Sequence, residues 1–507
     1  MEPEPQQKLV RGFSLLDATM IVVGSMIGSG IFITSAESAR LVGSPGWLIV
    51  AWALAGVLTI TGALCCAELA AMWPQAGGQY VFLRQAYGPS VGFLFGWALF
   101  LVIQTGTIAA VAVAFANFTG VLTEVVSAEN YLIRPFTVFP AFSTRLFSFN
   151  GYALSLSTQQ LVAVLMILLL TATNTRGLKT GKLIQNSFTF TKTAALLGLI
   201  VLGLTFGWNH QSAAYVSSWW NPTANGWHPL ASQLGFATTS NLLVGLALVL
   251  SLGRAMVGPL FAQSAWNNVT FTGGEVRDPG RNIPQALLFG CALVVGLYLL
   301  ANLAYVVTLP LNGIQNATQN RVATATMQAI LGTRGTILMA LAIMISTFGC
   351  NNGLILAGAR VYYAMARDGL FFNRVAQVNA HHVPAVALIA QGVWAAFLTL
   401  PRTLNLNART GISTYGNVYT QLLEYIVSAD LIFYLLMVAA VMVMRRKAPQ
   451  IERPYRTFGY PIVPLLYIGL AVAFILDLAY VAPSTSGIGY LLVFTGIPVY
   501  LVRHKRR

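Results

Sequence analysis

The chain has 507 residues, of which 56% are hydrophobic and only 8% are charged. Soluble domains carry about 25% charged residues, so this composition excludes a soluble globular protein and indicates a membrane protein with many spans. The four cysteines lie singly or as a pair inside apolar runs, and the sequence shows no disulfide framework, metal-ligand spacing or catalytic set. We therefore expect no cofactor, no metal and no enzymatic activity.

The first apolar run contains an unusual stretch, Gly24–Phe32 (GSMIGSGIF), with three glycines and two serines within seven positions. Glycine costs about 1 kcal/mol relative to alanine inside a helix. A broken backbone within a membrane is tolerated only where protein or a wet cavity surrounds it. The stretch predicts an interrupted helix whose freed amides bind a ligand. The alternative is that small residues only let a second helix pack closely.

Apolar runs of about 17 to 25 residues suit membrane helices. Twelve are predicted, at residues 16–41, 45–73, 90–118, 157–174, 185–208, 252–268, 283–308, 335–366, 383–401, 417–444, 460–481 and 485–502. Residues 236–252 are also apolar. They either extend the sixth span outward or form a separate external segment.

The basic residues predict the orientation of these spans, because Lys and Arg concentrate on the cytoplasmic side. With a cytoplasmic N-terminus, 19 basic residues fall inside and 7 outside. The outside residues are Arg40, Arg134, Arg145, Arg321, Arg334, Arg402 and Arg409. We expect a multi-pass protein of the plasma (inner) membrane with both termini in the cytoplasm. The net charge of +15 then follows from topology, and no nucleic-acid partner is expected.

A second interruption is predicted in the sixth span, at Phe261–Trp266 (FAQSAW), after Gly258 and Pro259. Broken helices in corresponding positions of two halves are typical of transporters with a binding site at the membrane midplane. Breaks in spans 1 and 6 predict two five-helix repeats. The expected divisions are a cytoplasmic tail (1–15), a first repeat (16–208), a second repeat with its preceding external segment (209–444), and two appended helices with a basic C-terminus (445–507).

Five motifs occur in order along the chain: GSMIGSGIF, AELAAMWPQAGGQYVFLRQAYGP (Ala67–Pro89), FAQSAWNN with EVRDPGRNIPQA, ARVYYAMARDGLF (Ala359–Phe371) and RRKAPQIERPYR. On these motifs the chain resembles permeases of the amino acid–polyamine–organocation (APC) superfamily. It is similar in particular to the light subunits of heteromeric amino-acid transporters and their bacterial relatives. The resemblance covers nearly the whole chain.

The resemblance implies an all-α membrane fold of the LeuT type, with a five-plus-five inverted repeat and transport by alternating access. It implies an amino acid held between spans 1 and 6, with its carboxylate on backbone amides of the first break and its ammonium on carbonyls of the second. Half-helix N-termini suit an anion and unwound carbonyls suit a cation. The substrate-binding residues implied are Ser25, Met26, Gly28, Ser29 and Gly30 in the first break and Phe261, Ala262 and Ser264 in the second.

Phe261 is implied to close over the substrate as an aromatic gate, the alternative being a packed core aromatic. The chain departs from the light-subunit pattern after Phe261, where Gln263, Ser264 and Ala265 stand in place of an aromatic followed by glycines. The added bulk and polarity argue against a purely large, apolar substrate. The loop of residues 119–156 has no cysteine, so no disulfide-linked heavy chain is expected there. The oligomeric state is left open.

Lys192 lies within the fifth span, about 12 Å from its start at 1.5 Å per residue. A charge at such depth costs roughly 3 kcal/mol on insertion scales. The resemblance implies that its ammonium takes the place of the sodium ion of sodium-coupled relatives. It then acts as a coupling group in a sodium-independent transporter. The alternatives are a proton-coupling lysine and a lysine that snorkels to the cytoplasmic surface.

Asp430 lies in the middle of the tenth span. It is predicted to contact a polar or cationic substrate side chain, to take up a proton, or to hydrogen-bond neighbouring helices. Arg254 belongs either to an external gate or to an interfacial anchor, and Glu424 either lines that gate or is solvated.

The predicted function is sodium-independent secondary transport of L-amino acids by alternating access, with exchange and neutral substrates favoured. The alternative is a proton-coupled symporter of amino acids, including cationic ones, or of polyamines. A non-transporting amino-acid sensor and a channel are more distant alternatives.

Overall fold

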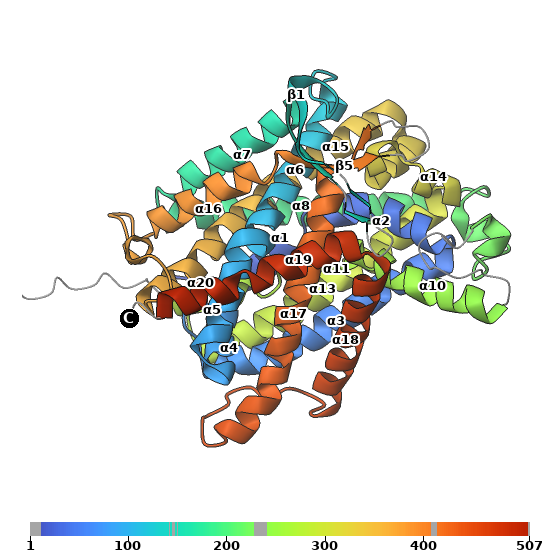
Figure 1. Ribbon diagram of the computed structural model, residues 1–507. Helices are drawn as coiled ribbons and strands as arrows, with labels where there is room; N and C mark the ends of the chain where they lie inside the picture. Colours follow the sequence, from blue (N-terminus) through green and yellow to red (C-terminus); the bar gives the residue numbers. More distant parts are fainter. Residues whose placement is uncertain are drawn as a thin grey trace, which may run out of the picture.

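The computed structural model describes residues 12–140, 142–143, 148–149, 151–227, 241–406 and 413–504. The predictions for residues 1–11, Arg145, Arg409 and 505–507 lie outside these ranges. Within them, helices occupy all twelve predicted spans (Figure 1). Ten are long and apolar enough to cross a membrane, and two shorter apolar helices, α7 (Thr158–Asn174) and α16 (Ala385–Phe397), occupy the fourth and ninth spans. The prediction of a polytopic helical membrane protein is confirmed.

The first half contains α1 (Leu15–Met26), α2 (Gly30–Val42), α3 (Pro45–Met72), α4 (Gln79–Tyr87), α5 (Pro89–Ala98), α6 (Gln104–Leu122), α7 (Thr158–Asn174) and α8 (Leu178–Phe206). The second half contains α10 (Asn241–Ala255), α11 (Val257–Ala262), α12 (Asn268–Phe271), α13 (Pro279–Thr308), α14 (Leu311–Gln315), α15 (Val322–Arg367), α16 (Ala385–Phe397) and α17 (Val418–Lys447). The last helices are α18 (Ile462–Val481), α19 (Pro483–Phe494) and α20 (Gly496–His504). A π-helical turn (Leu99–Ile103) joins α5 to α6.

The predicted bounds of the sixth span were wrong. Its helical part starts at Asn241 as α10, bends at Met256 and ends at Ala262 in α11. Residues 241–252 of the apolar segment therefore extend this span, which was one of the two alternatives, whereas residues 236–240 lie outside the described residues. The ninth span is shorter than predicted, because Pro401 starts a strand rather than continuing the helix.

A β-sheet covers one end of the helices and was not predicted. Strands β1 (Tyr131–Phe139), β4 (Gly151–Ser157), β5 (Pro401–Leu406) and β6 (Ser413–Tyr415) form an antiparallel sheet in that order. Strands β2 (Phe142–Ser143) and β3 (Ser148–Phe149) pair separately. The larger sheet ties the connection between spans 3 and 4 to the connection between spans 9 and 10. The all-α description thus holds for the spans but not for this end.

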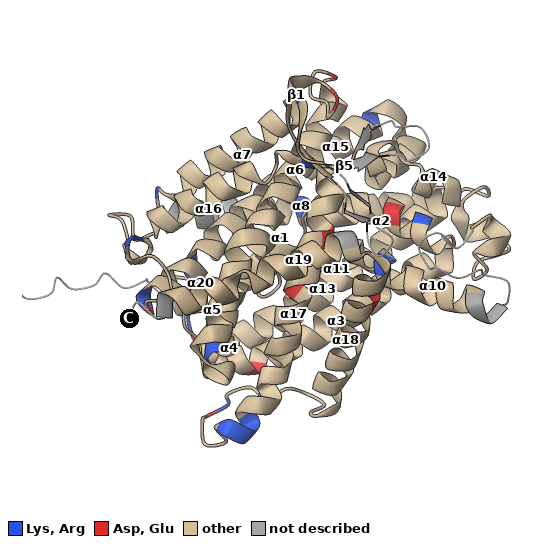
Figure 2. Ribbon diagram, in the orientation of Figure 1, with Lys and Arg blue, Asp and Glu red and all other residues tan. Residues whose placement is uncertain are grey.

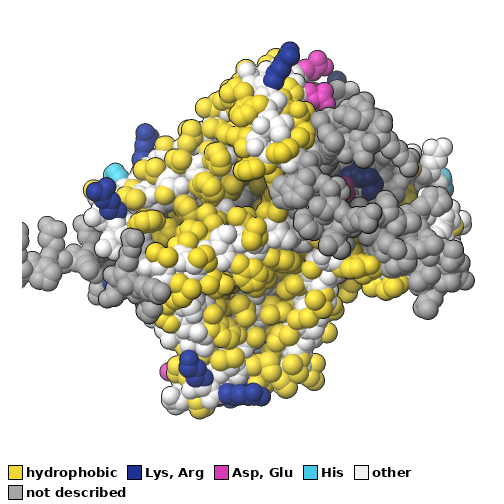
Figure 3. All heavy atoms as spheres, viewed as in Figure 1, with side chains coloured by type: hydrophobic (Ala, Val, Ile, Leu, Met, Phe, Trp, Pro, Cys, Tyr) yellow, Lys and Arg dark blue, Asp and Glu magenta, His cyan; other side chains and the backbone are white. Residues whose placement is uncertain are grey.

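The broken first span lies in the interior. Its most hydrophobic window is 83% buried, against 28% for α18 and 22% for the span formed by α19 and α20. Helix α1 packs against α13, α8 and α15, while α2 packs against α10 and α11. Apolar side chains of the outer helices cover the visible flank of the molecule (Figure 3), as expected of a surface that faces lipid. Irregular backbone in the first span is therefore enclosed by protein.

The molecule has two chemically different ends, which α17 connects. This helix starts beside the sheet and ends in the basic run Arg445–Lys447 (Figures 1 and 2). We call the two ends the sheet end and the basic end.

Buried ion pairs tie the connections together at the basic end. Arg360 of α15 donates to Glu275 at 2.9 Å, and both side chains are almost fully buried. The carbonyl of Glu275 accepts hydrogen bonds from the amides of Gly12 and Phe13, both at 2.9 Å. The segment before α1 is thereby fixed to the segment after α12 and to α15.

Replacing Glu275 by Gln is expected to lower the free energy of unfolding by about 3–5 kcal/mol, because the buried Arg360 then lacks a countercharge. Denaturant titration in detergent micelles measures the change. The control is Glu37→Gln, which breaks a half-exposed pair with Arg40 and is expected to cost about 1 kcal/mol or less. Equal losses in the two variants would contradict the assignment.

Candidate functional site

The first span breaks where its glycines and serines predict. Helix α1 ends at Met26, Ile27–Ser29 are not helical, and α2 begins at Gly30. The Gly28 amide donates a hydrogen bond to the Met26 carbonyl at 2.8 Å. A helix end leaves its last four carbonyls without intrahelical partners, so the break exposes acceptors on one side and donors on the other.

Side chains of three neighbouring helices occupy the carbonyls at the end of α1. Lys192 of α8 donates to Gly24 O, and Cys350 of α15 donates to Ser25 O at 3.2 Å. The Tyr298 hydroxyl of α13 donates to Met26 O at 2.8 Å. Ser346 of α15 lies at 3.3 and 3.4 Å from the carbonyls of Ile27 and Gly28. The carbonyl side of the break is thus filled by fixed donors.

Lys192 is fully buried, so the snorkelling alternative is wrong. Its ammonium sits at the C-terminal end of α1, where the helix dipole and the free carbonyls favour a cation. It is placed among α1, α8 and α15, with Cys350 as a neighbour.

The start of α2 forms the amide side of the break. Ser29 and Gly30 open α2, and amides in the first turn of a helix have no acceptor within that helix. Met26 differs, since it is the last residue of α1 and its amide lies within that helix. The Ser29 hydroxyl lies 3.0 Å from the Tyr419 hydroxyl at the start of α17.

The second break begins after Ala262, so the first two residues of the predicted stretch, Phe261 and Ala262, are still helical. Gln263–Asn267 are not helical, and Ala265 has a left-handed backbone (φ 63°). The Phe261 carbonyl accepts from the Ser264 amide at 3.1 Å and from the Ser264 hydroxyl at 2.7 Å. The carbonyl of Gln263 accepts from Thr59 of α3 at 3.3 Å.

The two breaks touch each other. A Cβ atom at Gly30 would lie 2.5 Å from Ala262 Cβ and 2.7 Å from Ala262 Cα, and one at Gly258 would lie 2.5 Å from Thr34 Cβ. Separations under 3.0 Å do not occur between real side chains. Glycine at position 30 therefore allows the amide end of α2 to meet the carbonyl end of α11.

Aromatic and charged residues close the breaks from the sheet end. Phe261 and Tyr419 meet edge to face, with ring centres 6.1 Å apart. Beside Tyr419, Arg254 of α10 pairs with Glu424 of α17 at 3.3 Å. Both line a cavity of about 40 Å³ next to Thr34. Arg254 therefore bridges two helices over the site rather than only anchoring the span at an interface.

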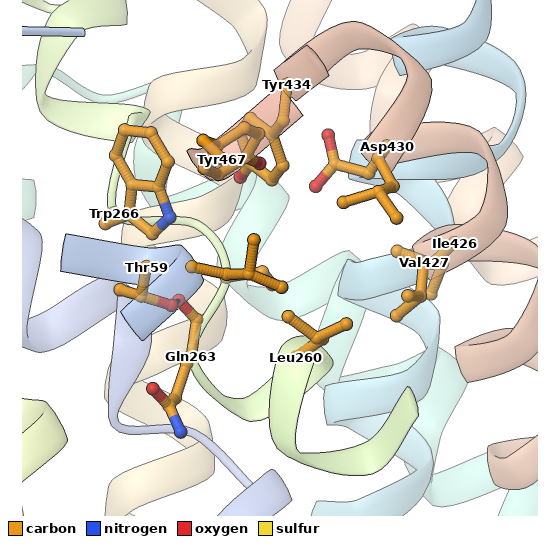
Figure 4. Close-up of a pocket in the computed structure, with 12 residues that line it drawn as sticks. Thr59, Leu260, Gln263, Trp266, Ile426, Val427, Asp430, Tyr434 and Tyr467 are labelled. Carbon is orange, nitrogen blue, oxygen red and sulfur yellow. Dashed lines mark hydrogen bonds between the residues drawn. The ribbon is translucent and has the colours of Figure 1, made fainter. Parts of the chain in front are cut away.

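Asp430 lies on the other side of the second break. It lines a cavity of about 30 Å³ with Ser264 and Trp266, and no residue of the first break lines this cavity. The Asp430 carboxylate points toward Tyr434 and Tyr467 (Figure 4). Trp266 stacks on Tyr434 with ring centres 5.0 Å apart. Asp430 thus shares a cavity with Ser264 but not with Ser29 or Gly30.

These spaces are too small for a ligand, since ligand pockets measure about 300–1,000 Å³. The structure therefore holds the two breaks in a closed conformation. It brings together most of the predicted site residues: Ser25, Met26, Gly28, Ser29, Gly30, Lys192, Phe261 and Ala262. Ser264 and Asp430 adjoin them across the second break.

Sequence reasoning missed Tyr419, Tyr298, Ser346 and Cys350. Each is a single polar or weakly polar residue in an apolar helix, and only the packing of α13, α15 and α17 against the break gives it a role. The depth of a charge could identify Lys192, but no comparable signal marks a buried tyrosine.

Comparisons with known proteins identify the family of the chain. The chain is 29% identical to the large neutral amino acids transporter small subunit 2 of Mus musculus, over 97% of this chain and 81% of the relative. It is 27% identical to the serine/threonine exchanger SteT of Bacillus subtilis, over 98% of both chains. It is 26% identical to the human cystine/glutamate transporter, over 98% of this chain and 87% of the relative. The family model described as amino acid permease matches residues 13–502, and the chain belongs to this family of membrane transporters.

Proposed function

We propose that the protein is a sodium-independent exchanger of neutral L-amino acids that works by alternating access. The observation that carries the proposal is the pairing of the two breaks. A fixed ammonium already satisfies the carbonyl end of α1, so no mobile cation is needed there. The amide end of α2 faces the carbonyl end of α11 across Gly30 and Ala262. These two helix ends suit the carboxylate and the ammonium of one amino acid.

In this proposal the amides of Ser29 and Gly30 hold the carboxylate, with Ser25, Met26 and Gly28 shaping the turn. The carbonyls around Phe261 and Ala262 hold the ammonium once Ser264 releases the Phe261 carbonyl. Phe261 and Tyr419 then form the gate toward the sheet end, because they separate the breaks from that end.

We further propose that the sheet end is external and the basic end cytoplasmic, in the plasma (inner) membrane. The excess of Lys and Arg at the basic end supports this orientation. All four cysteines are buried and unpaired, which supports activity without a disulfide-linked partner subunit. The names of the relatives cover large neutral amino acids, serine and threonine, and cystine and glutamate, so the exact side chain is decided by experiment.

A proton-coupled symporter of neutral or cationic amino acids is the second candidate, and Asp430 is the observation that favours it. This carboxyl group is buried and shares a cavity with Ser264 of the second break. The Asp430 carboxyl group could take up a proton or form an ion pair with a cationic substrate side chain that reaches that cavity.

Reconstituted liposomes test the exchange directly. We expect uptake of a labelled neutral L-amino acid to require an amino acid inside the vesicle, and to be unchanged when choline replaces sodium. Uptake into empty vesicles that follows an inward proton gradient and is lost in Asp430→Asn would establish the second candidate instead. Binding without any flux would indicate a sensor.

Replacing Lys192 by Met is expected to reduce exchange at least about tenfold. The variant leaves the buried Gly24 carbonyl without a donor, a penalty of about 1–3 kcal/mol. Lys447→Met at the basic end is the control and should exchange at the wild-type rate. Undiminished exchange by a correctly folded Lys192→Met variant would exclude the proposed role of the ammonium.

Gly30→Ala is expected to abolish exchange, because its methyl group would overlap Ala262. The double variant Gly30→Ala with Ala262→Gly should recover part of the rate, since the nearest atom is removed but the Ala262 Cα remains close. Gly296→Ala in α13 is the control, since a Cβ there meets open space. If Gly30→Ala exchanges as fast as Gly296→Ala, the two breaks do not meet during transport.

A further inference from the structure

A large cavity lies at the sheet end, separate from the two breaks. Its volume is about 590 Å³, within the range of ligand pockets. Its walls come from α6, the start of β1, β5 and the first turn of α17, and polar residues line much of it. They include Asn117, Tyr131, Gln159, Arg402 and Asn417. The unpredicted sheet thus builds a polar chamber where the resemblance implied only loops.

Arg402 of β5 supplies a buried positive charge to the wall of this chamber. Its side chain donates to the Tyr131 hydroxyl and, at 3.1 Å, to the Ala128 carbonyl, while its Nε has no hydrogen-bond partner. The residue is only 7% exposed. Among the described residues, no carboxylate forms an ion pair with it. A buried charge without a countercharge is costly, so Arg402 is suited to meet an anion that enters the chamber.

The charges around the chamber are arranged for a zwitterion. Arg321 lies behind its wall and donates to the side chain and carbonyl of Asn117 at 2.9 and 2.6 Å. Burial lowers the pKa of Arg321 to about 10, so this guanidinium remains charged at neutral pH. Glu129 lines the same chamber and is exposed. Positive charge therefore lies deep and negative charge lies toward solvent.

Tyr419 connects the chamber to the breaks. It lines both the 590 Å³ chamber and the 40 Å³ cavity that Arg254 and Glu424 also line. Its hydroxyl contacts Ser29 in the first break. A molecule in the chamber would therefore lie directly above the side chain that closes the way to Ser29.

We propose that the chamber is an entry subsite that takes the carboxylate of an incoming α-amino acid on Arg402 before Tyr419 opens. This proposal rests on the proposed function for the identity of the ligand. The ammonium of the same molecule lies toward Glu129. The subsite acts only on substrate arriving from the sheet end, because the closed breaks separate it from the basic end.

Propionate, a carboxylate without an ammonium group, tests the anion site without requiring transport. We expect it to raise the melting temperature of the wild-type protein and to lose most of this effect in Arg402→Gln. Arg402→Lys, which keeps the charge, should retain part of the effect. Arg134→Gln, which removes an exposed arginine of β1 outside the chamber, should behave as wild type. Gly30→Ala should also respond, because it alters only the central site. Equal stabilisation of wild type and Arg402→Gln would overturn the proposal.

Exchange kinetics in oriented liposomes test whether the ligand of the chamber is an amino acid and whether it enters from the sheet end. We expect Arg402→Gln to raise the KM at the sheet end at least fivefold and to leave the KM at the basic end unchanged. An equal rise on both sides would overturn the proposal in favour of a structural role for Arg402. If wild type exchanges no amino acid, the proposed function fails separately. In that case the assignment of an amino acid to the chamber is overturned, whereas loss of propionate binding in Arg402→Gln would still support an anion site at Arg402.

Discussion

The structure depends on how the backbone carbonyls at the end of α1 are satisfied inside a membrane. A helix cannot stop in an apolar interior unless its last carbonyls find donors. Here the donors are side chains of α8, α13 and α15, with the Lys192 ammonium on Gly24 O. Because they are fixed to surrounding helices, the break is a permanent feature of the fold. Its cation is part of the chain and not an ion from solution.

This arrangement leaves the two ends of the break chemically unequal. The carbonyl end is occupied, whereas the amide end at Ser29 and Gly30 meets the second break through the contact of Gly30 with Ala262. The residues that line the adjacent small cavity belong to two elements distant in sequence, Arg254 on α10 and Tyr419 and Glu424 on α17. In the proposed function, opening toward the sheet end would separate α10 from α17 at the Arg254–Glu424 pair. At the basic end, the Arg360–Glu275 pair and the Glu275 carbonyl hold the segment before α1.

The sequence was sufficient to predict features that violate the ordinary chemistry of a membrane helix. A glycine and serine cluster located the first break, Gly258 and Pro259 with the polar residues after them located the second, and its depth in the span identified Lys192. Residues that are ordinary in a membrane helix could not be recognised as site residues from the sequence. Tyr419 and Tyr298 look like ordinary core aromatics, and Asp430 gave no indication that it faces Tyr434 and Tyr467 rather than the first break. The sheet was missed because the paired strands β4 and β5 are separated by more than 240 residues, from Ser157 to Pro401. The role of Arg402 becomes visible only through this long-range pairing.

The most direct measurement is a cryo-electron microscopy structure of the protein with a bound neutral amino acid in sodium-free buffer. We expect substrate carboxylate oxygens within about 2.7–3.2 Å of the Ser29 and Gly30 amide nitrogens, with the Lys192 ammonium still on Gly24 O. A carboxylate held by a side-chain cation in the central site would contradict this expectation. So would a Lys192 side chain withdrawn from the end of α1.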